Sequence, residues 1–211
     1  PDKTQPSTFG SHLTSPSPRF VSAISSARIE SNSVTQFSDL GLSEGLLKAL
    51  AAEGYDTPTS IQIQAIPHVL AGRDVVGLAQ TGTGKTAAFA TPIIQRLAAS
   101  NRQAGHKGVR TLVLAPTREL AAQICESFRV YGKFEKISAF AVFGGVPLGR
   151  QIQTLARGVD VLVATPGRLL DLVQQRAVNL SHVEILVADE ADHMMDMGFI
   201  VPLKRIAKLL P

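Results

Sequence analysis

The chain has 211 residues, of which 45% are hydrophobic and 5% aromatic, and its formal net charge is +4. This length suits one sizeable domain with a buried core, and no apolar run is long enough to span a bilayer. The single cysteine, Cys125, excludes a disulfide framework and lacks the neighbours that activate a thiol. We therefore expect a cytoplasmic protein without a membrane segment, and the basic balance weakly favours a polyanionic partner.

Residues 1–36 differ from the rest, being rich in Ser, Thr and Pro and lacking sustained apolar periodicity. Such a segment buries too little apolar surface to offset the entropy lost on ordering. We expect a disordered extension or an artificial remnant, in preference to the transit peptide that its scattered arginines faintly suggest. The folded domain is expected over residues 37–211.

From Phe37 onward, short apolar runs alternate with stretches of helical periodicity. Ser43 is a suitable N-cap for a helix over 44–52, and Gly54 suits its end. Near-continuous apolar strands joined by helices predict an α/β domain with helices on both faces of a parallel sheet. Right-handed crossovers then bring all strand C-termini to one edge. The expected strands cover 75–78, 111–114, 137–143, 161–163 and 185–187, and the other expected helices cover 86–98, 118–131, 148–156 and 168–174.

A glycine-rich loop follows the first expected strand and opens a helix. Gly82 and Gly84 would let backbone N–H groups surround an anion, and the helix N-terminus adds a favourable dipole. Lys85 is expected to reach the β- and γ-phosphates of a nucleotide, and the Thr86 hydroxyl to bind Mg²⁺. A chance glycine-rich turn is the alternative, and the flanking strand and helix argue against it. The loop reads Ala79-Gln80-Thr81-Gly82-Thr83-Gly84-Lys85-Thr86.

An acidic stretch, Asp189-Glu190-Ala191-Asp192, directly follows the last expected strand. Asp189 is placed to hold Mg²⁺, and Glu190 to orient or polarise an attacking water. Taken alone, the pair would more often be a solvated acidic turn. Combined with the phosphate loop, it predicts the second half of an ATP site, with Lys85, Asp189 and Glu190 as its catalytic residues.

These stretches resemble the N-terminal RecA-like domain of DEAD-box ATP-dependent RNA helicases, and in detail the bacterial RhlE-like group, over residues 37–211. The family's phosphate loop begins with Ala, which accounts for Ala79 where the generic loop has Gly. The resemblance implies a RecA-like P-loop NTPase fold, ATP and Mg²⁺ as cofactors, and RNA as a partner.

The segment Pro58-Thr59-Ser60-Ile61-Gln62 resembles the family's adenine-recognising Q motif, with Phe37 at the upstream spacing. A Gln amide donates and accepts at once, so Gln62 could contact both N6 and N7 of adenine. Phe37 could stack on the base. Taken alone, Gln62 would be an ordinary surface helix residue and Phe37 an ordinary core residue.

Three further segments resemble the family's RNA-contacting motifs. Arg118 and Arg168 begin helices after strands, and helix N-termini, hydroxyls and arginines together bind phosphates. Gly145 would let a nucleic-acid backbone approach closely. Contacts of this kind carry no sequence code, so we expect sequence-independent binding. Taken singly, each segment is equally well a helix cap or a tight turn. The segments are Pro116-Thr117-Arg118, Gly144-Gly145 and Thr165-Pro166-Gly167-Arg168.

Two departures and one absence qualify the resemblance. Ala188 replaces the usual Leu and is expected to remove buried volume at a strand end, a loss that can cost on the order of 2–5 kcal/mol if nothing repacks. His193 replaces a common Arg and is expected to be a surface helix residue. The family's Ser-Ala-Thr motif and second RecA-like domain, whose arginine finger is worth roughly 10³–10⁵ in rate, are not among the 211 residues.

We therefore expect this chain alone to bind nucleotide, to hydrolyse it very slowly and not to unwind RNA. One alternative is an RNA-binding or regulatory module whose site does not turn over. Another is a P-loop ATPase that acts on DNA or protein, against which the Q motif and the Thr-Pro-Gly-Arg segment argue.

Overall fold

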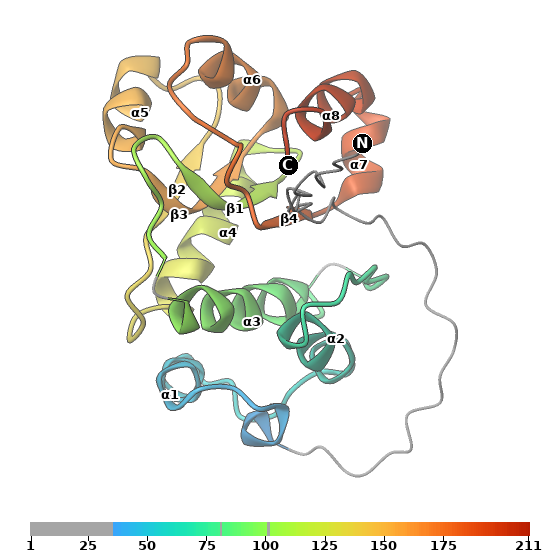
Figure 1. Cartoon of the computed structure of the whole chain (residues 1–211). Helices are drawn as coiled ribbons and strands as arrows, with labels where there is room; N and C mark the ends of the chain where they lie inside the picture. Colours follow the sequence, from blue (N-terminus) through green and yellow to red (C-terminus); the bar gives the residue numbers. More distant parts are fainter. Residues whose placement is uncertain (1–35, 81, 101) are drawn as a thin grey trace, which may run out of the picture.

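The computed structural model describes residues 36–80, 82–100 and 102–211. Thr81 of the expected phosphate loop and residues 1–35 of the expected tail lie outside the described residues. Figure 1 shows the described elements along the chain. They are η1 (Phe37–Leu40, a 3₁₀ helix), α1 (Glu44–Ala52), α2 (Ser60–Leu70), α3 (Lys85–Ala99), β1 (Val109–Leu114), α4 (Arg118–Tyr131), β2 (Ala139–Val142), α5 (Leu148–Leu155), β3 (Val159–Ala164), α6 (Pro166–Gln174), β4 (Ile185–Ala188), α7 (Ala191–Asp196) and α8 (Ile200–Ala207).

The strands form one parallel sheet in the order β2-β3-β1-β4. Leu112 of β1 lies opposite Leu162 of β3 on one side and Leu186 of β4 on the other. Parallel neighbours need crossover connections, and α4, α5 and α6 supply them between successive strands. The predicted parallel α/β sheet is confirmed, and four of the five predicted strands are present within one or two residues of their expected bounds.

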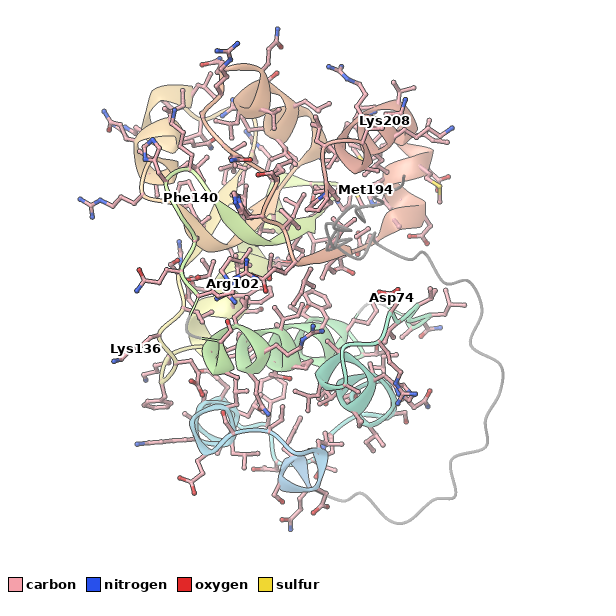
Figure 2. All side chains as sticks on the ribbon, viewed as in Figure 1. Asp74, Arg102, Lys136, Phe140, Met194 and Lys208 are labelled. Carbon is pink, nitrogen blue, oxygen red and sulfur yellow. The ribbon has the colours of Figure 1, made fainter. Side chains whose placement is uncertain are left out.

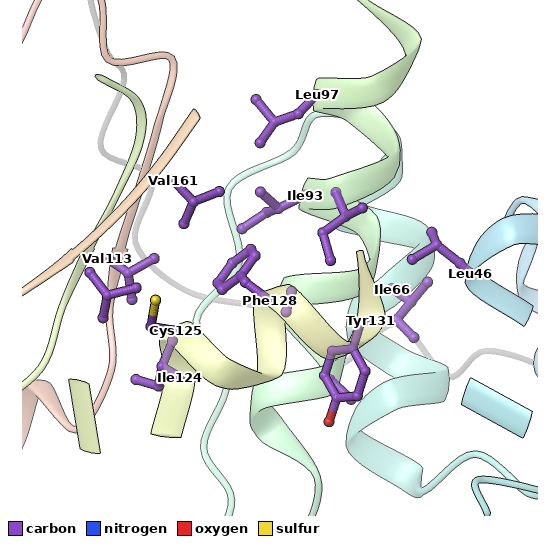
Figure 3. Close-up of a cluster of buried hydrophobic side chains, with 14 of the residues drawn as sticks. Leu46, Ile66, Ile93, Leu97, Val113, Ile124, Cys125, Phe128, Tyr131 and Val161 are labelled. Atoms are coloured by element: carbon purple, nitrogen blue, oxygen red, sulfur yellow. The ribbon is translucent and has the colours of Figure 1, made fainter. Parts of the chain in front are cut away.

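Both faces of the sheet are buried, and the alternation of side chains divides the core into two clusters. Val113 and Val161 point to the face covered by α1, α2, α3 and α4, where Phe128 and Leu46 are also buried. Leu112 and Leu162 point to the other face, which α5, α6, α7 and α8 cover. Figure 1 shows these two helical layers, and Figure 3 shows the first cluster at close range.

The second cluster reaches the C-terminal helices. Met194 of α7, labelled in Figure 2, is fully buried there, and Ile206 of α8 is buried beside it. His193, one residue before Met194, is half exposed, as expected for a surface helix residue. Burial of Met194 and Ile206 in the second cluster therefore holds α7 and α8 against the sheet.

The predicted strand at 75–78 is wrong. These residues pair with no strand in the described part of the chain, and the side chains of Val76 and Leu78 are 56% and 92% exposed. Apolar composition indicates a tendency to burial, but a strand also needs a partner with a free edge. In this structure residues 75–77 instead line a groove that β4 also lines.

Ala188 at the end of β4 is exposed. The expectation that Ala188 removes buried volume is therefore wrong for the described structure, because a larger side chain at this position would not be enclosed. Among the described residues, no helix combines the length and the apolar content that a bilayer span requires.

Helix termini follow the sequence signals. The Ser43 hydroxyl accepts a hydrogen bond from the Leu46 amide at the start of α1, and the Thr117 hydroxyl accepts one from the Leu120 amide at the start of α4. Each cap satisfies an amide that would otherwise lack a partner in the first helical turn. The predicted bounds of α1 and α4 are confirmed in full.

A buried arginine connects three strand segments to the end of α3. The Arg110 side chain is 4% exposed, and its Nε donates to Glu184 Oε1 at 3.0 Å. Its Nη1 donates to the carbonyl oxygens of Arg102 and Leu97 and lies 3.6 Å from Asp160 Oδ1. A buried guanidinium is tolerated only when its donors are occupied in this way. Arg110 therefore fixes the sheet edge opposite the candidate site.

Cys125 lies in the first cluster and is 1% exposed, and burial raises the pKa of its thiol. Because the thiolate is the reactive form, both effects suppress its chemistry. We expect an aromatic disulfide reagent to modify Cys125 in the native chain at least about 100-fold more slowly than in denaturant. Absorbance of the released thiolate measures both rates, and similar rates would contradict the buried position.

Candidate nucleotide and nucleic-acid site

The phosphate loop is a turn that the α3 N-terminus closes. Gly84 is the N-cap of α3 and, like Gly82, has a left-handed backbone, with φ of 87° and 83° respectively. Lys85 Nζ donates to the Ala79 carbonyl at 2.6 Å, and Thr83 Oγ1 donates to the Gln80 carbonyl at 2.7 Å. The ammonium group thus lies across the mouth of the loop, beside the first amides of a helix, where an anion is stabilised.

Gln62 holds this loop from α2. Its side chain is fully buried, its Oε1 accepts from the Thr59 amide at 2.8 Å, and its Nε2 donates to the Gly84 carbonyl at 3.2 Å. Thr59 Oγ1 donates to the Thr83 carbonyl at 2.9 Å. A Cβ on Gly84 would collide with Gln62 Nε2, so this approach requires glycine.

Adenine recognition by Gln62 and Phe37 stays a prediction. Each polar atom of the Gln62 amide has one partner within the protein, which leaves one N–H and one lone pair for a base. The side chain is fully buried, so contact with a base would need it to be uncovered. Phe37 is 4% exposed, and its ring packs edge-on against Tyr55 with centroids 6.5 Å apart. Stacking on a base would need this ring to be uncovered.

The acidic pair lies at the C-terminal end of β4. The Asp189 amide donates to the Leu114 carbonyl at 3.0 Å, which attaches it to the end of β1. Glu190 is the N-cap residue of α7 with φ of 49°, a left-handed conformation that is unusual for a residue with a side chain. Glu190 Oε2 lies 3.4 Å from His193 Nδ1.

Burial raises the pKa of Asp189, and the positive charge of Lys85 opposes this shift. The carboxylate and ammonium groups therefore interact electrostatically, and both residues line the groove between β4 and residues 75–77. No group of three or more His, Cys, Asp or Glu side chains within residues 36–80, 82–100 and 102–211 is arranged to hold a metal. The Thr86 hydroxyl and the Asp189 carboxylate are oxygen donors that suit Mg²⁺ with water and phosphate completing its coordination.

The two predicted RNA-contacting arginines bond to one loop, residues 143–146. Arg118 Nη1 donates to the Gly144 carbonyl at 3.2 Å, and Arg168 Nη1 donates to the Val146 carbonyl at 3.0 Å. Gly145 has φ of 77°, and a Cβ there would collide with the Arg118 guanidinium. Glycine at this position therefore allows the close approach of the Arg118 guanidinium, in addition to any approach of nucleic acid.

The acidic pair and the three RNA-type segments meet at one edge of the sheet, as predicted from right-handed crossovers. Gly144 and Gly145 follow β2, Thr165 follows β3, and Thr117 follows β1, so the three RNA-type segments lie on neighbouring strands. The acidic pair follows β4, the next strand along. Hydrogen bonds from Thr165 to Val142, from Ala115 to Ala164 and from Asp189 to Leu114 continue the sheet beyond the strand ends. Pro116 and Pro166 are buried there, and Gly167 is exposed.

Sequence reasoning missed Gln151 on α5. It is 4% exposed, its Oε1 accepts from Arg168 Nη1 at 2.8 Å, and its Nε2 donates to the Phe143 carbonyl at 3.2 Å. A signal was present, because Gln151 is three residues after Leu148 and four before Leu155, on the apolar face of the helix. A polar residue on such a face usually has buried partners.

Comparison with known proteins decides the family. A family model described as DEAD/DEAH box helicase matches residues 59–211 of the chain. The chain belongs to this family. The match includes the phosphate loop, the acidic pair and the three RNA-type segments of this DEAD-box domain. It confirms the predicted family, and the resemblance to the RhlE-like group stays a prediction.

Curated relatives of the DEAD-box domain carry helicase names. It is 46% identical over 173 residues to "ATP-dependent RNA helicase DBP2" of Candida glabrata. This alignment covers 82% of this chain and 32% of that protein. It is 46% identical over 176 residues to "ATP-dependent RNA helicase CshA" of Limosilactobacillus reuteri, covering 83% of this chain and 34% of that protein. The chain thus spans about a third of the length of these relatives.

A solved structure has the same fold. The crystal structure of a DEAD box protein from the hyperthermophile Methanococcus jannaschii matches with a TM-score of 0.77 and 34% identity, over 84% of this chain and 47% of that one. The RecA-like fold predicted for the DEAD-box domain is therefore confirmed.

Proposed function

We propose that this chain is the ATP- and RNA-binding domain of an RNA helicase that couples ATP hydrolysis to local separation of RNA strands. The observation that carries the proposal is the arrangement along one sheet edge. The phosphate-loop lysine and the acidic pair lie at one end of that edge, and three loops with phosphate-binding character follow on the neighbouring strands. An event at the nucleotide can thereby be transmitted to RNA through residues of adjacent strands.

In this proposal, Lys85 exchanges the Ala79 carbonyl for the β- and γ-phosphates of ATP. Thr86 and Asp189 would hold Mg²⁺, which supplies charge neutralisation at the phosphates when it is bound. Glu190, at the N-terminus of α7, orients a water for in-line attack on the γ-phosphorus. Phosphoryl transfer requires little covalent chemistry from the protein, so positioning and charge account for most of the catalysis.

RNA would bind across the loops after β1, β2 and β3. The hydroxyls of Thr117 and Thr165 begin α4 and α6, and exposed Arg118 and Gly145 lie between them. These groups suit phosphate and sugar, so we propose that binding is independent of base sequence. We further propose a second RecA-like domain as a partner that supplies an arginine finger, so that the 211-residue chain alone turns ATP over slowly.

Competition between RNA and DNA tests the RNA assignment against a DNA-directed ATPase. A labelled single-stranded RNA bound to the chain is titrated with unlabelled RNA or DNA of one sequence, and anisotropy is followed. We expect RNA to compete at least about tenfold better, because a reader of the 2′-hydroxyl loses contacts on DNA. Equal competition by RNA and DNA would favour an ATPase that acts on DNA.

A buried lone cysteine suits a reducing compartment, and we propose that the protein acts in the cytoplasm.

A further inference from the structure

The loop of residues 143–146 is held through its carbonyl oxygens by side chains from three helices. Gln151 of α5 donates to the Phe143 carbonyl, Arg118 of α4 to the Gly144 carbonyl, and Arg168 of α6 to the Val146 carbonyl. Backbone loops usually satisfy such carbonyls with water or with local turns. Three separate side-chain donors therefore specify one conformation of this short segment.

The amides of the same loop are left available. Among the described residues, the Gly144 and Gly145 amides donate no hydrogen bond, and Gly145 is exposed. With three of its four carbonyls bonded to side chains and both glycine amides free, the loop presents mainly donors. Consecutive backbone amides at a glycine turn are a common anion-binding arrangement.

Gln151 links the Arg168 side chain to the 143–146 loop. It accepts from Arg168 with one end of its amide and donates to Phe143 with the other, and it is 4% exposed. The Arg168 side chain is only 12% exposed and its Nη1 serves both Gln151 and Val146. Arg168 therefore faces inward, with Gln151 and Val146 accepting from its Nη1 and Asp171 Oδ2 lying 3.8 Å from its Nε.

We propose that Gln151 is a positioning residue for RNA binding: through Arg168 and the Phe143 carbonyl it holds the Gly144 and Gly145 amides in place for an RNA phosphate. This inference rests on the proposed function, because it needs the loop to contact RNA. It reassigns Arg168 from direct phosphate binding to support of the loop. Gln151 itself does not touch RNA, since α5 buries it behind the loop.

The first test replaces Gln151 by methionine in the 211-residue chain. Methionine has similar volume and fills the site, but it neither donates nor accepts strongly, so the loop and Arg168 each lose a partner. Anisotropy of a labelled ten-nucleotide single-stranded RNA should report affinity about tenfold weaker than that of the original chain. Affinity for a fluorescent ATP analogue should stay within about twofold, because no contact of Gln151 reaches the phosphate loop.

The matched control is Gln153→Met, the same change two residues away on the exposed side of α5. It should leave RNA affinity unchanged. If the original chain binds RNA and Gln151→Met binds equally well, the positioning role is wrong while the RNA assignment stands. If the original chain binds no RNA, the proposed function fails and this inference fails with it. A Gln151→Met loss matched by Gln153→Met would also overturn the role.

A double-mutant cycle separates positioning from a general loss of folding. Arg168→Met and Gln151→Met should each weaken RNA binding, and the double variant should be little weaker than Arg168→Met alone, because Gln151 acts largely through Arg168. Additive losses would contradict the proposal. If Gln151→Met lowers ATP-analogue affinity as well, Gln151→Glu serves instead, since it keeps an acceptor for Arg168 and loses only the donor to Phe143. If Gln151→Glu binds RNA as tightly as the original chain does, the hydrogen bond to the Phe143 carbonyl does not position the loop.

Discussion

Replacing Lys85 by alanine should weaken ATP binding by roughly 10- to 100-fold, the loss expected for hydrogen bonds to a charged group. Lys85 Nζ lies at the mouth of the phosphate loop, 2.6 Å from the Ala79 carbonyl, beside the N-terminus of α3. No other ammonium or guanidinium group among the described residues bonds within that loop, so its charge has no substitute. Titration with a fluorescent ATP analogue in the presence of Mg²⁺ measures the change.

The matched control for this change is Lys204→Ala on the exposed surface of α8, which alters the net charge equally. Its nucleotide affinity should equal that of the original chain. Melting temperatures of both variants, measured without nucleotide, check that the fold is retained. Unchanged affinity in Lys85→Ala would overturn the phosphate-loop assignment.

Glu190→Gln should lower ATP turnover about 10²- to 10⁴-fold in the longer protein that contains this chain, while ATP affinity changes by only a few-fold. The substitution keeps the shape of the side chain and removes the charge that would polarise the attacking water. Glutamine has the same length as glutamate, so we expect the left-handed turn at position 190 to be retained. Release of phosphate at saturating ATP and RNA measures the rate.

Asp196→Asn is the control for Glu190→Gln, because it removes an exposed acidic charge at the other end of α7. Its turnover should equal that of the original protein. If Glu190→Gln keeps full turnover, then Glu190 does not orient the water and another group must do so.

The parts of the fold that could be predicted are those that local chemistry determines. The α4 helix begins at Arg118 because Thr117 caps it, and the strands that became β1 and β3 carry apolar residues on both faces. These signals act over a few residues, so a pattern in the sequence is enough to locate them. The handedness of the crossovers was enough to predict that the loops after β1, β2, β3 and β4 lie at one edge of the sheet.

The parts that could not be predicted depend on partners distant in the chain. Residues 75–78 have a strand-like composition, but no edge among the described strands pairs with them. Arg118 and Arg168 were correctly placed at the site edge, yet their bonds to the 143–146 loop depend on contacts across more than twenty residues. Gln62 likewise bonds to Gly84 across the gap between α2 and the phosphate loop.

We propose that nucleotide chemistry at β4 is coupled to RNA at the loops after β1, β2 and β3. The decisive measurement is ATP turnover by the longer protein with and without single-stranded RNA. We expect RNA to stimulate turnover at least about tenfold and DNA of the same sequence to have little effect. Turnover that is equal with and without RNA would contradict the claim.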